Sequence, residues 1–223
     1  MRESASSLAV RVLTAGVALG GCTHYEKRRS AASSSTSAPT TATTLETTTT
    51  TAPTTTTTAP GLSDASRVGF EGIGPVRIGM TLAQASAAVG KPFRLEDTEV
   101  SEGCAFAVVE GGPKGLSFMV GRDTNNGPWR VLRTDVDEGS AIATISGIRL
   151  GATEAQVKAA YQGPGKGGSL TVETHPYVPT GHYLLYDVDG KGGRLLIFET
   201  DGTKVTEFRA GDEAAVQAIE GCA

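Results

Sequence analysis

In the part of the chain that we expect to fold, the residues best suited to acid–base chemistry are His175 and His182. A serine hydrolase would also need an activated serine, but the Gly-x-Ser-x-Gly turn is absent from the sequence and no spacing links a serine to either histidine. The two histidines flank the turn region 176–181. We therefore interpret them as solvated loop residues, with a weak metal contact or a pH-sensitive surface as the alternative.

Two groups of carboxylates could in principle hold a hard cation. The segment 187–190 has alternate aspartates and a glycine, as a calcium loop does, but the residues that follow supply Lys191 and Arg194 instead of further ligands. We interpret it as a hairpin turn. We interpret the second group, Asp135, Asp137 and Glu138, as a solvated turn after a strand. The sequence therefore predicts no metal site, no cofactor and no catalytic residue.

A third possibility, a glycine-rich phosphate loop, is also disfavoured. The segment 163–168 contains four glycines but lacks the P-loop spacing and its Lys-Ser/Thr ending. We expect it to connect a helix to a strand. Trp129, Phe106, Phe118 and Met119 are expected to pack mainly in a core, with an exposed aromatic patch as the alternative.

Cys22 has the most definite covalent chemistry. Arg2 and Arg11 precede a short apolar stretch, and small residues lead up to the cysteine. The segment 19–22, Leu-Gly-Gly-Cys, resembles the lipobox of bacterial lipoprotein signal peptides. The resemblance implies a signal peptide over 1–21, cleavage before Cys22 and a lipid on its thiol. A simple secretory signal with an incidental cysteine is the alternative.

With Cys22 assigned to lipid, Cys104 and Cys222 remain as an even pair in a chain bound for an oxidising compartment. We expect a disulfide between them, with two free buried thiols as the alternative. The bond would close a loop of well over a hundred residues, for which loop entropy gives roughly 4–5 kcal/mol as an upper figure.

A threonine-rich segment follows the expected lipid anchor. Residues 33–60 include 15 threonines and three prolines among 28 residues, without an aromatic side chain. Such a segment has too little to bury to offset the entropy of ordering. We therefore expect residues 22–65 to form a disordered Thr/Pro-rich tether. Its composition also permits O-glycosylation.

The remainder is acidic. From Ser63 onward there are 15 lysines and arginines against 21 aspartates and glutamates, and the basic residues are scattered. Nucleic-acid binding draws on a concentrated positive field, so no nucleic-acid partner is expected. An apolar run long enough to span a membrane is absent from the sequence.

An internal repeat organises this part of the chain. Residues 76–85 align with 147–157 at an offset of 72, and both copies carry a Thr-x-x-Gln capping-box spacing. Thr81 and Thr153 are therefore predicted helix N-caps, with helices starting at Leu82 and Glu154. Strand-like segments follow each helix. They are 105–109, 116–120 and 131–136 in the first copy, and 183–188, 195–199 and 205–209 in the second. A last helix is expected over 213–220.

The segment 78–81, Ile-Gly-Met-Thr, with its helix and Gly90-Lys91-Pro92 resembles the helix-entry motif of small bacterial lipoprotein domains of the SmpA/OmlA type. Two such units in tandem resemble the architecture of β-lactamase inhibitory protein, and the C-terminal end is similar to a group of actinobacterial exported proteins. The resemblance covers most of residues 66–222. It implies an α+β fold of two tandem helix plus antiparallel-sheet repeats, 66–140 and 141–223, with a short C-terminal helix.

These features predict a lipoprotein on the outer face of the cell membrane that acts as a non-enzymatic binding or interaction module of the cell envelope. Its expected partners are the membrane, through the lipid on Cys22, and an extracytoplasmic protein or cell-wall component. The alternatives are an inhibitor of a secreted hydrolase such as a β-lactamase, with the loop 122–127 as the inhibitory segment, and an enzyme of unrecognised type.

Overall fold

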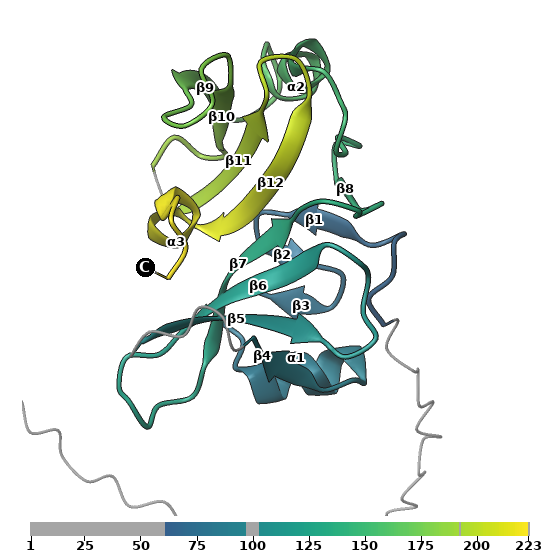
Figure 1. Cartoon of the computed structure of the whole chain (residues 1–223), viewed down its shortest axis with the longest axis vertical. Helices are drawn as coiled ribbons and strands as arrows, with labels where there is room; N and C mark the ends of the chain where they lie inside the picture. Colours follow the sequence, from purple (N-terminus) through teal and green to yellow (C-terminus); the bar gives the residue numbers. More distant parts are fainter. Residues whose placement is uncertain (1–60, 97–102, 192, 223) are drawn as a thin grey trace, which may run out of the picture. The chain divides into compact units, whose positions relative to one another are not determined.

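The computed structural model describes residues 61–96, 103–191 and 193–222 (Figure 1). The expected signal peptide, the lipidation site Cys22 and the tether up to residue 60 lie outside the described residues. No helix in the described ranges is long and apolar enough to cross a membrane.

The largest element is an eight-stranded antiparallel sheet with the order β4-β5-β6-β7-β12-β11-β10-β9. Its two halves meet where β7 pairs with β12. The expected strands are present with small shifts at their ends, whereas β4 and β9 were not predicted. The bounds are β4 Phe93–Leu95, β5 Cys104–Val109, β6 Leu116–Gly121, β7 Arg130–Val136, β9 Ser169–Thr174, β10 His182–Asp187, β11 Arg194–Thr200 and β12 Val205–Asp212.

A second, small sheet was also missed from the sequence. Its order is β3 (Val76–Arg77), β2 (Gly72–Ile73), β1 (Arg67–Gly69) and β8 (Ala143–Thr144). The β1–β8 pair is parallel, unlike every pairing expected from the sequence. Strands of two or three residues show no alternation to detect, so only tertiary pairing reveals them. Segments from both predicted repeats thus meet in this sheet.

Two helices begin where the sequence predicted. In α1 (Leu82–Val89), Thr81 Oγ1 accepts from the Gln84 N–H and the Gln84 side chain accepts from the Thr81 N–H. In α2 (Glu154–Tyr161), Thr153 and Gln156 make the same reciprocal pair. Each box provides partners for backbone N–H groups that have none within the helix. Thr81 and Thr153 are therefore helix caps.

The third helix, α3 (Glu213–Gln217), is shorter than the expected 213–220. The chain leaves helical geometry at Ala218 and closes a turn in which the Gly221 N–H bonds to the Ala218 carbonyl. This turn brings Cys222 to Cys104, and the two form a disulfide with Cα atoms 5.3 Å apart.

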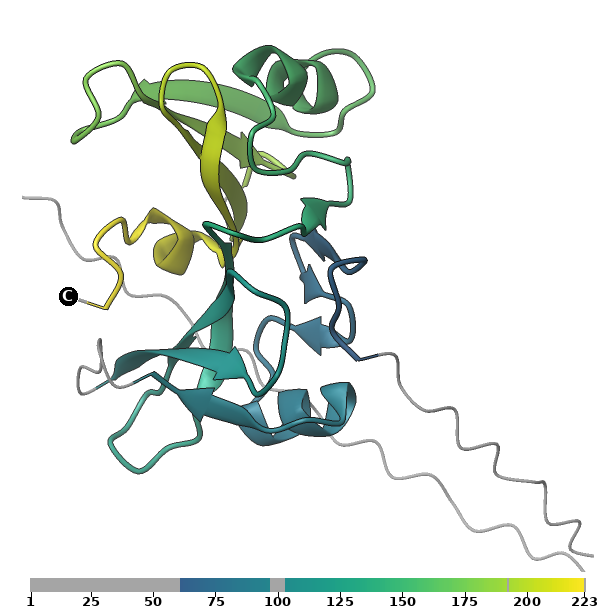
Figure 2. The ribbon, with the colours of Figure 1, turned by 45° about the vertical axis from the view of Figure 1, so that its right-hand side comes forward.

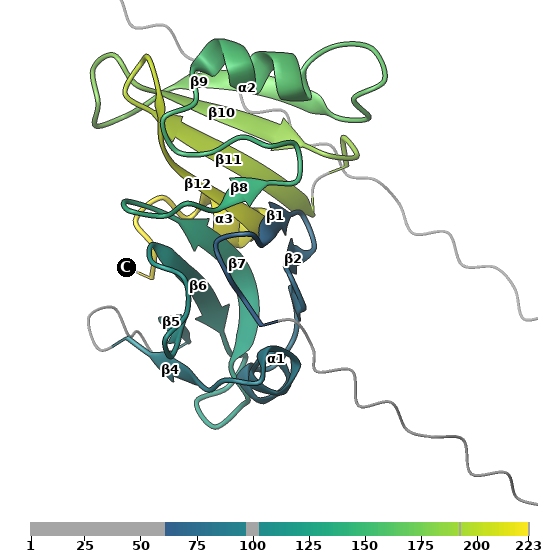
Figure 3. The same ribbon diagram turned by 90° about the vertical axis from the view of Figure 1, so that its right-hand side faces the viewer.

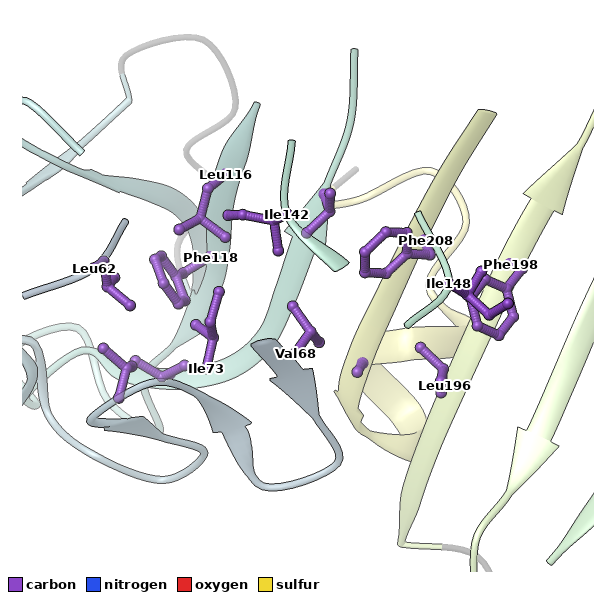
Figure 4. Packing of buried hydrophobic residues seen from close by; sticks show 14 of the residues in the cluster. Leu62, Val68, Ile73, Leu116, Phe118, Ile142, Ile148, Leu196, Phe198 and Phe208 are labelled. Atoms are coloured by element: carbon purple, nitrogen blue, oxygen red, sulfur yellow. The ribbon is translucent and has the colours of Figure 1, made fainter. Parts of the chain in front are cut away.

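The main core lies on one face of the large sheet. The small sheet, α1 and α2 cover this face (Figure 3), and the core runs without interruption across the β7–β12 junction. Figure 4 shows Phe118 with Ile73 beneath the first half, and Phe208 and Phe198 with Ile148 beneath the second. The domain is thus a sheet-rich α+β fold with two sheets.

The other face of the large sheet carries α3 (Figure 2). We call it the α3 face. Two small apolar clusters hold the helix there. One contains Val216 with Tyr183, Leu195 and Ile197, and the other contains Ala215 and Cys222 with Met119. Charged side chains lie between and beside these clusters, and the candidate site lies on this face.

Candidate functional site

A β-bulge in β7 determines which side chains reach the α3 face. Met119 pairs with Arg133 while the next residue, Val120, pairs with Val131, so Leu132 is an extra residue on β7. Leu132 packs against the cluster of Ala215 and Cys222, and Arg133 also points toward α3. Strand alternation then brings Asp135 to the same face.

Arg133 is buried beneath the C-terminal end of α3, where only 4% of the residue is exposed. Its Nη1 donates to the carbonyl oxygens of Ala215 at 2.6 Å and Ala218 at 2.9 Å, and its Nε lies 2.8 Å from Asp135 Oδ1. Carbonyls at a helix C-terminus lack intrahelical partners and favour positive charge. Arg133 therefore caps α3, and Asp135 balances its charge.

Arg209 on β12 has the same role from the other half of the sheet. Its Nε donates to the Val216 carbonyl at 2.7 Å, and its Nη1 contacts the carboxylates of Glu199 and Glu207. Only 2% of Arg209 is exposed. Two guanidiniums thus bind three carbonyls around the end of α3, and three carboxylates face these two cations.

His175 is not a solvated loop residue, so that expectation was wrong. The residue is only 8% exposed and its ring stacks on Tyr183 at a centroid distance of 4.4 Å. Nδ1 accepts from the N–H groups of Tyr177 and Val178, so Nε2 must carry the proton that is donated to Glu199 Oε2 at 3.3 Å. His175 therefore extends the polar network from Glu199 on β11 to the segment between β9 and β10.

His182 lies at the start of β10, not in a loop, and its side chain is 37% exposed. Its Nδ1 is 2.7 Å from Glu154 Oε1, which also accepts from Thr200 Oγ1 at 2.7 Å. Burial acts to raise the pKa of Glu154, but the bonds from Thr200 and His182 outweigh it and lower that pKa. This network fastens the start of α2 to the sheet and contacts none of the pockets on the α3 face.

A pocket of about 430 Å³ opens beside the C-terminal end of α3. We call it the acidic pocket, because five carboxylates and one guanidinium line it. Its walls come from β5, β6, β7, β12 and the turn after α3. The lining residues are Glu96, Phe106, Ser117, Arg133, Asp135, Asp137, Glu207, Ile219, Glu220 and Gly221.

Asp135 is the central acceptor of this pocket. Its side chain is 6% exposed, Oδ1 pairs with Arg133, and Oδ2 has no hydrogen-bond partner among the described residues. Burial raises the pKa of Asp135 although the neighbouring Arg133 acts to lower it. The backbone N–H of Met119 also acts to lower the pKa of Asp135, but Oδ2 itself accepts no hydrogen bond from it. Asp135 was expected in a solvated turn, and that expectation was wrong.

Two further carboxylates of the pocket, Glu207 and Asp137, hold protons more tightly than usual. Burial, together with repulsion from Glu199 and Asp135, raises the pKa of Glu207 to about 7. Burial and the charge of Asp135 also raise the pKa of Asp137. Burial is the larger cause of both shifts, and the repulsion between neighbouring carboxylates adds to it, which a proton or an external cation would relieve.

A smaller pocket, of about 270 Å³, lies against other parts of α3 and the strands β9 to β12. Tyr183 and Arg209 line it, and the Tyr183 hydroxyl and Arg209 Nη2 are buried without a hydrogen-bond partner among the described residues. Ile219 lines both pockets. On the α3 face, one buried acceptor and two buried polar groups without a described partner thus belong to residues that line the two pockets.

The remaining sequence candidates have structural roles. Asp187 Oδ1 accepts from the N–H groups of Asp189 and Gly190, which makes 187–190 a hairpin turn as expected. In the described part of the chain, no group of three metal-ligating side chains is spaced to hold an ion. Phe118 and Met119 are buried, whereas Phe106 and Trp129 are partly exposed, and the Arg122 guanidinium lies 4.4 Å from the Trp129 ring centroid.

Asp135 and His175 were considered in the sequence but assigned to solvent, and the arginines and glutamates of the network were not singled out, although a signal was present. Arg133-Thr134-Asp135 and Glu207-Phe208-Arg209 place two opposite charges on one face of the last strand of each half. Charges spaced by two inside an otherwise apolar strand indicate a polar layer against the sheet.

Comparison with protein-family models, with curated proteins and with solved structures finds no match to this chain.

Proposed function

We propose that the chain is an exported lipoprotein, held on the outer face of the cell membrane by a lipid on Cys22, and that its folded domain is a non-enzymatic binding module of the cell envelope. The Leu-Gly-Gly-Cys sequence over 19–22 supports the anchor. The Cys104–Cys222 disulfide fits an oxidising compartment. The threonine-rich segment between anchor and domain suits a spacer.

The acidic pocket is the proposed binding site, and one observation carries this assignment. Asp135 has a buried carboxylate oxygen without a hydrogen-bond partner among the described residues, and it lines a pocket large enough for a small ligand or a protruding side chain. Buried polar atoms are nearly always paired, so an unpaired one at a pocket wall favours a ligand group there. Arg133 caps α3 and pairs with Asp135, and Glu207 contacts Arg209, which is not the arrangement of a nucleophile with its base.

The anchor and the binding site are tested separately. The full chain is expressed with its leader in a bacterial host, and the mass of its N-terminal peptide is measured for the wild type and Cys22→Ser. We expect diacylglycerol on the wild type alone, together with its partition into detergent. Three full-length proteins are then compared for retention of solubilised envelope components: the wild type, Asp135→Asn, and Asp189→Asn in the exposed hairpin as the matched control.

Retention that depends on Asp135 but not on Asp189 is expected. An unmodified Cys22 in the membrane fraction would overturn the anchor, and equal retention by all three chains would overturn the site. Robust turnover of hydrolase substrates by the wild type would contradict a non-enzymatic role.

We also propose that the two halves of the domain are tandem copies of one helix–sheet unit. The Gly79 N–H bonds to the Val131 carbonyl, and the Gly151 N–H bonds to the Val205 carbonyl. The return bonds from Val131 and Val205 go to Met80 and Ala152, the next residue in each case. Both glycines have a positive φ, 87° and 80°. The segment before each helix is thus bonded in the same way to a strand of its own half, which supports duplication. Hydrogen exchange during folding would test it, because equivalent helices and strands of the two halves should become protected in the same order.

A second candidate function, inhibition of a secreted hydrolase, is favoured by the loop 122–127. Its residues Asp123 to Asn126 are exposed, and the loop is held in shape by bonds from Arg122 to the Asn125 carbonyl and from the Gly127 N–H to the Thr124 carbonyl. A pre-ordered exposed loop binds a cleft at a reduced entropic cost. Inhibition of a β-lactamase panel by the wild type, and its loss on replacing Asn125 and Asn126 by alanine, would establish this function. Full enzyme activity at high micromolar concentration of the chain would exclude it for that panel.

A further inference from the structure

We propose that the ligand of the acidic pocket is an alkylammonium group, bound with its charged head at Asp135 Oδ2 and its carbon chain against Phe106 and Ile219. This inference depends on the proposed function, since it names the ligand class of the same site. It covers an amine on a free small molecule and the ε-ammonium of a lysine side chain.

The charge balance of the pocket favours a cation. Glu96, Asp135, Asp137, Glu207 and Glu220 contribute up to five negative charges, and Arg133 contributes the only positive charge among the described lining residues. The Nη1 of that arginine is already bound to two α3 carbonyls. An anion entering the pocket would therefore face uncompensated carboxylates, whereas a cation would relieve their mutual repulsion.

The hydrogen-bonding inventory favours a donor. Among the described residues, Asp135 Oδ2 is a buried acceptor without a hydrogen-bond partner, and Oδ1 of the same carboxylate forms an ion pair with Arg133 Nε at 2.8 Å. An ammonium has three N–H donors and no acceptor. One N–H group of the ligand would donate to Oδ2, and Glu207, which lines the same pocket, would be attracted by the same cation. Charge-assisted hydrogen bonds of this kind are the stronger ones.

The shape of the lining favours an alkyl stem over a bare inorganic ion. Phe106 and Ile219 contribute the apolar part of the wall, and Ile219 is 44% exposed, so a carbon chain would cover it. A hard metal ion prefers six or more oxygen ligands converging at short distance. The described residues contain no group of three ligating side chains so arranged.

The surface continues into a neighbouring depression of about 570 Å³, which shares Asp137 and Glu207 with the acidic pocket and adds Glu138 and Leu150. Carboxylates thus extend beyond the reach of a single ammonium. A ligand with two ammonium groups joined by a short alkyl chain would meet carboxylates at both ends. We therefore expect a diamine to bind more tightly than a monoamine of the same length.

The test is calorimetric titration of the full detergent-solubilised chain with 1,5-diaminopentane, 1-pentylamine and uncharged 1,5-pentanediol. A tripeptide with blocked ends and a central lysine is the fourth probe. The diamine should bind at least threefold more tightly than the monoamine, and the diol should not bind. Saturation by the tripeptide but not by the diamine assigns the ammonium to a protein or peptide source. Saturation by the diamine but not by the tripeptide assigns it to a free amine.

Asp135→Asn keeps the shape of the side chain and removes its charge, and it should weaken binding at least tenfold. Glu207→Gln changes a more exposed side chain of the same pocket. Its affinity for the probes provides the test if Asp135→Asn fails to fold. Asp189→Asn should leave affinity unchanged. Absence of binding by both the diamine and the tripeptide, or undiminished affinity in both pocket variants, overturns the inference. If envelope components are nevertheless retained through Asp135, the proposed function stands and only the ligand class is wrong.

Discussion

The buried pair of Arg133 and Asp135 makes a prediction whose size can be worked from the structure. Arg133→Met keeps most of the aliphatic volume but removes the charge, so a buried carboxylate and the carbonyls of Ala215 and Ala218 lose their partner. Removing one member of a buried ion pair costs about 3–5 kcal/mol. We expect a loss in that range for the free energy of unfolding near pH 8.

A second substitution separates the two contributions. In Arg133→Met/Asp135→Leu the unpaired charge is gone, and the remaining loss comes from the two carbonyls, at about 1–3 kcal/mol for each one that stays buried. Fraying of the short α3 would hydrate them and keep the loss near the lower end. The double variant should therefore be about 1–3 kcal/mol more stable than the single variant, and about 2 kcal/mol less stable than the wild type.

The assay is urea unfolding followed by the fluorescence of Trp129, the only tryptophan in the sequence. Measurements at pH 5 and pH 8 test the direction in which the stability loss changes with pH. Without Arg133, the pKa of Asp135 in the folded state rises further above its unfolded value, so stability falls as pH rises. The single variant should therefore lose more at pH 8 than at pH 5. A loss below about 1 kcal/mol at pH 8, or a double variant no more stable than the single one, would refute the assignment of a buried charge pair.

Three further predictions follow from single features of the domain. Cys222→Ser, which opens a loop with a sequence separation of 118, should lower the free energy of unfolding by about 2–5 kcal/mol, and reduction of the wild type by dithiothreitol should match it in urea titrations. Glu207→Gln should flatten the pH dependence of stability between about pH 5 and 7.5. The folded pKa of about 7 exceeds the ordinary 4.5, so the wild type loses stability as pH rises through that window, by about 1–2 kcal/mol after allowing for its partial exposure. Thr81→Ala should cost about 1 kcal/mol in thermal unfolding and Thr81→Ser much less, because serine keeps the capping oxygen.

The parts of the fold that the sequence predicted are those determined by local chemistry. The Thr-x-x-Gln spacing fixes both helix starts because the cap and its partner are only three residues apart. β9 was missed because it is an edge strand with mostly exposed residues, which leaves no apolar alternation to recognise. The expected end of α3 was wrong because the turn toward Cys222 is set by a partner 118 residues away.

The candidate site was missed for a related reason. Asp135 and His175 were assigned to solvent because charged and polar residues usually lie there. The sequence does not reveal that α3 folds over β7 and β12, which converts those positions into a buried layer. The opposite charges spaced by two in β7 and β12 were the available signal, and their meaning depends on knowing that these strands are neighbours.

The order of strands in the large sheet has a consequence for how the chain reaches this structure. Its central pair joins β7 to β12, and β12 is the last strand in chain order to enter the sheet. Until β12 has paired with it, β7 is an open edge of the first half-sheet, which invites pairing with a second, partly folded chain. Arg133 and Asp135 lie on that edge strand, and burying their charges against the apolar surface of another chain would be unfavourable. The charges that later cap α3 thus also protect the chain against aggregation before the fold is complete.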